Sequence, residues 1–114
     1  MTLLGYARVS TTHQSVDMQV QALKDAGAGQ VWAEQMSGGR EHRPAVSALL
    51  AAATTGDVLM VWRLDRLGRS LPHLLSVAAD LDARGIELRS LTEAIDTTTA
   101  GGRLVFQVFA AVAQ

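Results

Sequence analysis

Residues 58–62, Val58-Leu59-Met60-Val61-Trp62, form the stretch of this sequence that decides the fold. Five apolar residues in a row, preceded by a Gly56-Asp57 turn, are typical of a strand that is buried on both faces. Such strands belong to parallel sheets whose faces are covered by helices. The stretch therefore predicts an α/β domain, with the polar residues 63–70 leaving the end of a central strand.

The segments on either side of this strand alternate between strand-like and helix-like patterns. Short apolar runs between turn residues predict strands, and apolar residues that recur every three or four positions predict helices. We expect Ser15 to cap the first helix, Gly27 to end it, and Thr92–Gly102, which is dense in Thr and Gly, to form a loop. The predicted strands are Leu3–Val9, Val31–Ala33, Val58–Trp62 and Ile86–Leu91, and the predicted helices are about Ser15–Ala26, Pro44–Ala53, Leu71–Arg84 and Arg103–Gln114. This alternation predicts an α/β fold with a mostly parallel central sheet and helices on both faces.

Length and composition limit the classes of protein to which the chain can belong. At 114 residues, of which 48% are hydrophobic, it fits one packed globular domain. The absence of cysteine excludes disulfides and thiolate catalysis, and no apolar run approaches the roughly 20 residues that span a bilayer. The N-terminus, Met1–Gly5, lacks the basic start of a signal peptide. We therefore expect a soluble, cytoplasmic protein with no membrane partner.

Three polar clusters, residues 8–10, 37–43 and 63–70, follow predicted strands. In open α/β sheets ligands bind where the carboxyl ends of the strands meet their loops, so we expect the clusters to gather there. The net charge of −1 gives no basic surface to the domain as a whole, and the ten basic residues are all arginine except Lys24. Because a guanidinium group binds phosphate oxygens through two parallel hydrogen bonds, the placement of these arginines predicts a phosphate site.

The cluster at residues 63–70 is the densest of the three. Arg63, Arg66 and Arg69 are separated by apolar and turn residues. A solvated basic turn is the simpler interpretation, but Leu64 and Leu67 interleave with the charges and predict a turn that is partly packed. Its position after a buried strand also favours a functional site.

Ser10 is the hydroxyl that directly follows the first predicted strand. A serine hydroxyl is a weak nucleophile unless a base or a positive field assists it. We expect His13, the nearest histidine, to be a surface residue rather than that base. No histidines and carboxylates stand at metal-ligand spacing, so we predict neither a metal site nor a cofactor. The G-x-S-x-G pattern of serine hydrolases is absent as well.

Several of these segments resemble motifs of the small serine recombinases, the resolvase and invertase family. Residues 5–11, Gly-Tyr-Ala-Arg-Val-Ser-Thr, resemble the opening motif of that family, and residues 64–69, Leu-Asp-Arg-Leu-Gly-Arg, resemble its second signature. Ser37-Gly38 with Arg43 before a helix is similar to a third element, and residues 111–114, Ala-Val-Ala-Gln, are similar to part of its dimer helix. The resemblance implies a resolvase-like catalytic domain with a C-terminal dimerisation helix.

The resemblance also implies an activity, the cutting and rejoining of DNA at specific sites without a metal ion. Ser10 would attack the scissile phosphodiester, forming a 5′-phosphoserine and releasing a 3′-hydroxyl, and Asp65 would support the site through hydrogen bonds. A positive field from fixed arginines would stabilise the charge of the transition state in place of metal ions. The phosphate-binding residues would be Arg8, Arg43, Arg66 and Arg69, with supporting roles for Tyr6, Gln19 and Ser37.

The resemblance further implies partners and a domain organisation. The partner would be double-stranded DNA, and the protein would form a homodimer that becomes a tetramer in the active synapse. The predicted last helix has no consistently polar face, which indicates burial on more than one side, and we expect Phe106, Phe109 and Val112 to reach a partner chain. Family members continue this helix and then carry a DNA-reading helix-turn-helix domain. We therefore expect residues 1–114 to be a catalytic domain truncated within its last helix.

Two other functions are compatible with the same residues. One is a catalytically inactive α/β dimerisation or regulatory module that keeps the fold. The other is a phosphohydrolase that uses Ser10 on small phosphate esters. Covalent trapping on DNA separates the three, because only a recombinase forms an adduct between Ser10 and DNA.

Overall fold

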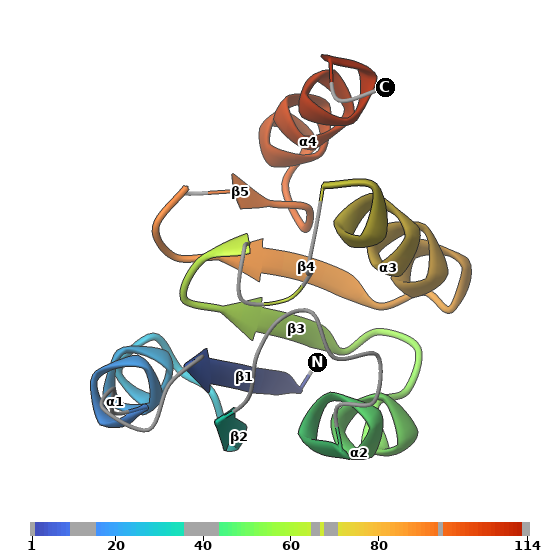
Figure 1. The fold of residues 1–114 in the computed structure, drawn as a ribbon. Coiled ribbons are helices and arrows are strands. Elements are labelled where there is room, and N and C mark those ends of the chain that lie inside the picture. The colour runs from blue at the N-terminus through green and yellow to red at the C-terminus, as the bar shows by residue number, and fades with distance from the viewer. Residues whose placement is uncertain are drawn as a thin grey trace.

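The computed structural model describes residues 2–9, 16–35, 44–64, 67, 71–93 and 95–112. Within these residues the chain forms a five-stranded sheet and four helices (Figure 1). In chain order the elements are β1 (Leu3–Val9), α1 (Asp17–Asp25), β2 (Gln30–Gln35), α2 (Pro44–Ala52), β3 (Val58–Val61), α3 (Leu71–Ala83), β4 (Glu87–Ser90), β5 (Ile95–Asp96) and α4 (Ala100–Val112). Among the helices described, none is both long and apolar enough to cross a bilayer.

The sheet has the strand order β2-β1-β3-β4-β5. β1 pairs in parallel with β2 on one side and with β3 on the other, β3 pairs in parallel with β4, and only the short β5 is antiparallel. The prediction of a mostly parallel sheet is therefore confirmed. The chain runs from β1 to a neighbour on one side and then crosses to β3 on the other side. This reversal makes the carboxyl ends of β1 and β3 a topological switch point, and in open α/β sheets ligands bind in the crevice outside such strand ends.

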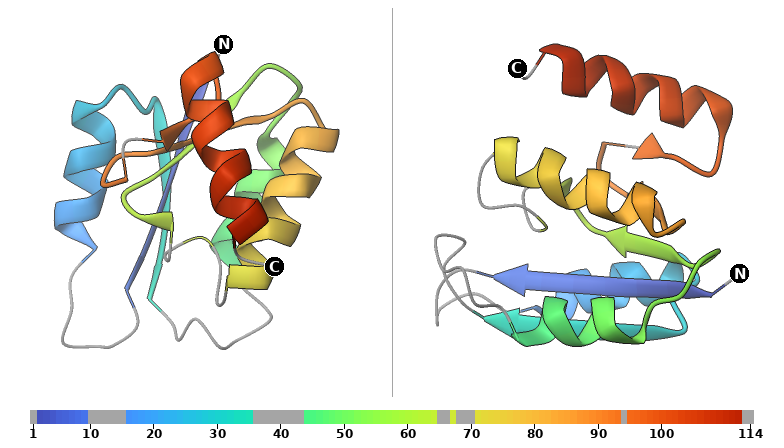
Figure 2. Two further views of the ribbon diagram at one scale, coloured as in Figure 1. Left: turned by 90° about the horizontal axis from the view of Figure 1, so that it is seen from above. Right: turned by 90° about the vertical axis from the view of Figure 1, so that its right-hand side faces the viewer.

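Helices cover both faces of the sheet, as predicted. α1 lies on one face, where Leu23 packs with Ala7 and Met60, and α2 and α3 lie on the other (Figures 1 and 2). Gly5 lies under α1, and a Cβ atom added there would come within 3.3 Å of the Leu23 Cβ atom. The small residue in the middle of β1 thus lets α1 pack close to the strand, close enough for a side chain of α1 to reach the strand backbone.

The first helix begins one residue later than predicted. Val16, and not Ser15, occupies the N-cap position, and it has no side-chain capping hydrogen bond. Its carbonyl instead accepts the N–H of Val20 at 2.9 Å, and its side chain packs into the core beneath α1. Apolar burial therefore sets this helix start, while the prediction that Gly27 ends the helix is confirmed by its φ of 110°.

The prediction that Thr92–Gly102 forms only a loop is wrong, because the stretch contains a short strand and the start of a helix. β5 forms within that stretch and α4 begins at Ala100, three residues before the predicted start. Thr99 caps α4, because its hydroxyl accepts the N–H of Gly102 at 2.9 Å. Two consecutive glycines disfavour a helix and concealed this start in the sequence.

Packing against β5 explains why one of these glycines is needed. A Cβ atom at Gly102 would lie 2.0 Å from the carbonyl oxygen of Asp96, whereas one at Gly101 would meet no atom within 4 Å. No side chain fits at Gly102 without moving the backbone. The first turn of α4 is therefore fixed directly against the edge strand of the sheet.

Candidate active site

The carboxyl end of β1 carries Arg8, whose side chain is buried and only 4% exposed. The pairing of β1 with β3 ends at Tyr6 and Val61. At Arg8, two residues beyond Tyr6, the side-chain amide of Gln19 makes the hydrogen bonds that β3 no longer provides. The Arg8 N–H donates to Gln19 Oε1 at 3.1 Å, and Gln19 Nε2 donates to the Arg8 carbonyl at 2.8 Å. Gln19, predicted as a supporting residue, is itself buried and fixes the strand two residues before Ser10.

Tyr6 and Glu34 connect β1 and β2 to the start of α2. The Tyr6 hydroxyl donates to Glu34 Oε2, and Glu34 Oε1 accepts the N–H of Ala45 at 3.1 Å. A carboxylate is favourable at this place because the N-terminus of a helix carries partial positive charge. Glu34 is also the register partner of Arg8 in the sheet. The role of Glu34 is not predictable from the sequence, since its partners lie 11 and 28 residues away along the chain.

The turn after β3 is packed, as the interleaved leucines predicted. Leu64 and Leu67 are 3% and 0% exposed, and the Leu67 N–H donates to the Leu64 carbonyl at 3.0 Å. Arg63 stacks over Trp62, with its guanidinium carbon 5.2 Å from the centre of the ring. A freely solvated basic turn would not place two leucines in the core, so Leu64 and Leu67 have defined positions after β3.

The remaining predicted site residues come after these strands in the sequence. β1, β2 and β3 are parallel, so their carboxyl ends, and the residues that follow them, start from the same edge of the sheet (Figure 1). The described residues at that edge are the end of β1, the start of α2 and the leucines after β3. Ser10, Ser37, Arg43, Asp65, Arg66 and Arg69 lie outside the described residues.

The predicted interface helix α4 has two different sides. Phe106 is half-buried and packs against the core of its own chain, and the side chains of Phe109 and Val112 lie outside the described part. Leu104, Val105 and Val108 are 61%, 55% and 55% exposed. Sequence reasoning did not single out these three residues, because a helix that is apolar on every side does not reveal which side its own core covers.

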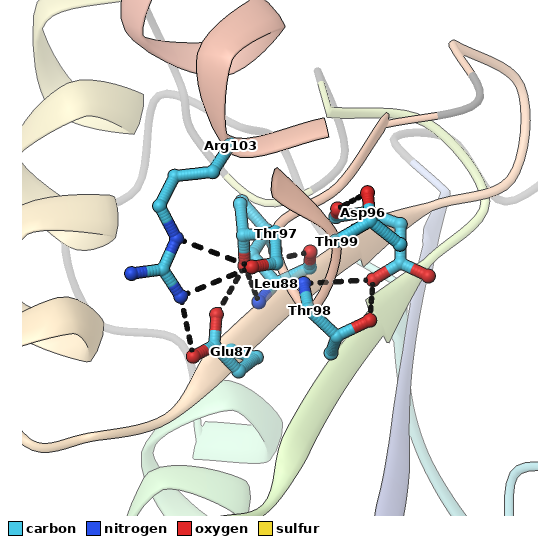
Figure 3. A network of polar contacts seen from close by, with 7 residues as sticks. All are labelled: Glu87, Leu88, Asp96, Thr97, Thr98, Thr99 and Arg103. Carbon is cyan, nitrogen blue, oxygen red and sulfur yellow. Dashed lines mark hydrogen bonds and ion pairs between the residues drawn. The ribbon is translucent and has the colours of Figure 1, made fainter. Parts of the chain in front are cut away.

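A second polar cluster lies at the amino end of β4, where α4 starts (Figure 3). Arg103 donates to Glu87 at 2.9 Å and to the Thr97 carbonyl at 3.1 Å, and the Thr97 hydroxyl donates to Glu87 at 2.7 Å. These residues border a groove of about 270 Å³ between α3 and α4, which is lined mainly by apolar side chains such as Leu81 and Phe106. The polar groups of this cluster bind one another and hold α4 on the sheet.

Residues 3–114 match the family model described as the N-terminal domain of resolvase. The chain belongs to this family. It is 47% identical over 112 residues to the serine recombinase Gin of Escherichia phage Mu and 45% identical to a DNA-invertase of Escherichia phage P1, in each case over 98% of this chain. The chain spans 58% and 60% of the length of these two relatives.

A solved structure agrees with the family assignment and with the fold. The N-terminal catalytic domain of TP901-1 integrase matches with a TM-score of 0.83 and 29% identity, over 98% of this chain and 93% of that domain. The predicted resolvase-like fold is therefore confirmed.

Proposed function

We propose that this chain is the catalytic domain of a site-specific DNA recombinase. One observation supports the proposal in this chain of the resolvase family. Two hydrogen bonds between Gln19 and the backbone of the buried Arg8 hold the end of β1 at the crevice beside β3, directly before Ser10. This is the edge of the sheet where ligands bind in open α/β folds. A strand end held by an amide, next to a serine, suits a nucleophile that must be aimed at a fixed phosphate.

In the proposed reaction the Ser10 oxygen attacks the phosphorus of a DNA phosphodiester. The Ser10 hydroxyl loses its proton as the new bond forms, the bond from phosphorus to the 3′ oxygen breaks, that oxygen takes a proton, and the 5′ phosphate stays on Ser10 as an ester. Arg8, Arg43, Arg66 and Arg69 would bind the phosphate oxygens, whose negative charge increases in the transition state. Asp65, Tyr6, Gln19 and Ser37 would support the site. Because the phosphoserine conserves the energy of the broken bond, the reverse attack by a 3′-hydroxyl rejoins DNA without ATP or a metal ion.

The proposed partners follow from the reaction. The substrate is double-stranded DNA, read mainly by a separate helix-turn-helix domain, and the reaction takes place in the cytoplasm. Strand exchange requires two duplexes to be cut in register, so we propose a homodimer that pairs into a tetramer in the active synapse. The exposed residues Leu104, Val105 and Val108 support the proposal that α4 contacts another chain.

Covalent trapping tests the proposed reaction. The domain, joined to a DNA-reading domain of known site, is incubated with DNA that carries a nick near the cleavage position, so that the cut end diffuses away and rejoining fails. We expect a covalent complex between protein and DNA that disappears in the Ser10→Ala variant, while the circular dichroism of the folded protein is unchanged. An adduct that survives in Ser10→Ala, or the absence of any adduct with hydrolysis of simple phosphate esters instead, would contradict the proposal.

A further inference from the structure

The carboxyl ends of β3 and β4 are joined by a polar contact that the proposed reaction does not yet use. Beyond their last paired residues, Val61 and Ser90, the two strands stay connected, because the Leu91 N–H donates to the Val61 carbonyl at 3.0 Å and the Thr92 N–H donates to the Trp62 carbonyl at 2.9 Å. The turn after β4 is thus held against the segment that leaves β3. That segment leads into Asp65 and Arg66.

Glu93 completes this connection. Its two carboxylate oxygens lie 3.3 and 3.4 Å from the Leu64 nitrogen, whose N–H donates to them. Ser90, which is buried and 2% exposed, donates its hydroxyl to the same carboxylate and orients it. The Glu93 carboxylate is therefore held in place by Ser90 of β4, and it accepts a hydrogen bond from the backbone of Leu64, the residue that precedes Asp65.

We infer that Glu93 is a positioning residue for the catalytic turn, which it holds through the Leu64 N–H. Leu64 and Leu67 fix the apolar side of this turn in the core. A carboxylate on the N–H at its start fixes the rotation of the turn as well, because a negative group is favourable at the amino end of a helical turn. The proposed roles of Asp65 and Arg66 depend on the direction in which this turn presents them. The inference rests on the proposed function.

The sequence contains a matched control for this contact at the opposite end of the same strand. Asp57 precedes β3, and its carboxylate accepts the Thr54 N–H at 2.9 Å and the Thr54 hydroxyl at 3.3 Å. The Thr54 N–H lowers the pKa of the Asp57 carboxyl. Both carboxylates therefore hold a backbone N–H and a hydroxyl at a turn. One turn lies at the amino end of β3, away from the crevice, and the other lies at its carboxyl end.

The test compares Glu93→Ala, Glu93→Gln and Asp57→Asn in the same DNA-competent chain. The readouts are the single-turnover rate of adduct formation at saturating protein, the affinity for DNA, and the temperature of unfolding. We expect Glu93→Ala to slow adduct formation about tenfold with DNA affinity unchanged, since a small misplacement of catalytic groups is costly. Glu93→Gln, which keeps an oxygen acceptor for the Leu64 N–H, should recover part of this rate. Asp57→Asn should lower the unfolding temperature without changing the rate in the folded protein.

A second variant keeps the inference testable if Glu93→Ala folds poorly. Ser90→Ala removes the hydroxyl that orients the carboxylate, and we expect a loss of about threefold in adduct formation. Wild-type rates in both Glu93→Ala and Ser90→Ala, or equal losses in the Glu93 and Asp57 variants, would overturn the inference while the wild-type adduct still supports the proposed function. If the wild-type chain forms no adduct at all, the proposed function itself is wrong.

Discussion

Two arginines of this protein, Arg8 and Arg103, each lie among polar groups, but their surroundings in the structure differ. Arg103 is half exposed, and its guanidinium group binds Glu87 and the Thr97 carbonyl of its own chain. Exposed ion pairs of this kind contribute little to stability, and this one joins the start of α4 to β4. Arg8 is buried at the carboxyl end of β1. Burying a guanidinium group opposes folding unless other groups of the protein pair with it, so a buried arginine keeps its charge at a fixed place.

In this comparison it is position in the fold, rather than the number of charges, that separates the proposed catalytic cluster from the structural one. The Arg103 cluster lies at the amino end of β4, and the Arg8 cluster lies at the crevice between β1 and β3. Ligands gather at the second kind of place. Substitutions in the two clusters test this difference.

Removing each arginine in turn tests the comparison directly. We expect Arg8→Ala to slow the formation of the covalent DNA adduct about 100-fold or more, as the loss of one fixed charge donor to a transition state does. Arg103→Ala should stay within about twofold of the wild type. Single-turnover trapping measures both variants. Equal losses in the two variants would mean that burial at the strand end does not distinguish the arginines.

Lysine substitutions sharpen the assignment of the arginines after β3. We expect Arg66→Lys and Arg69→Lys each to slow adduct formation about tenfold, because an ammonium group cannot reproduce the two parallel hydrogen bonds of a guanidinium group. The same trapping assay measures the rates, with Arg84→Lys as a control. Arg84 binds the carbonyls of Leu50 and Ala53 at the end of α2, remote from the crevice. Near-normal rates in both variants would mean that the basic residues after β3 form a solvated turn without a catalytic role.

Two neighbouring glycines test the structural side of the comparison. Gly102→Ala should destabilise the domain by about 3 kcal/mol, because its Cβ atom would overlap the Asp96 backbone. Gly101→Ala has open space around it and should stabilise the domain by about 0.5 kcal/mol, since alanine favours helix. Denaturant unfolding measures both. Equal stabilities for the two variants would show that α4 does not press against β5.

The outer side of α4 provides the smallest expected effect. We expect the 114-residue chain to self-associate weakly and in a concentration-dependent manner through Leu104, Val105 and Val108, whose apolar area is exposed in the monomer. Val105→Glu with Val108→Glu should abolish this association with little loss of stability. Phe106→Glu should instead destabilise the fold, because Phe106 packs on its own core. Sedimentation over a range of concentrations tests this. A chain that stays monomeric at high concentration would contradict the interface.

The sequence predicted the layers of this fold well because its strands and helices carry strong local signals. The apolar run at residues 58–62 and the glycine after α1 each act through their immediate neighbours. The strand order was not predictable, since spacing does not encode which strands pair. The start of α4 was missed because the two glycines disfavour a helix locally, while Thr99 and contact with β5 stabilise it.

The candidate site was predicted as a set of residue types at the carboxyl edge and not as a set of contacts. The site depends on hydrogen bonds between residues 11 to 29 positions apart in the chain. Gln19 binds Arg8, Glu34 binds Ala45, and Glu93 binds Leu64. The family resemblance named Gln19, but nothing in the local sequence distinguishes Glu34 and Glu93 from ordinary surface residues. Only the register of β1 with its neighbours and the closeness of α1 to Gly5 bring such partners together.

The identity of the residue that carries the DNA tests the central claim most directly. The trapped complex is prepared in EDTA, digested with protease and nuclease, and its modified peptide is located by mass spectrometry. We predict a single phosphoester on Ser10, joined to the 5′ end of the cut strand and formed at the same rate with and without magnesium. A linkage to another residue, a linkage to the 3′ end, or an adduct that forms only with magnesium would contradict the account.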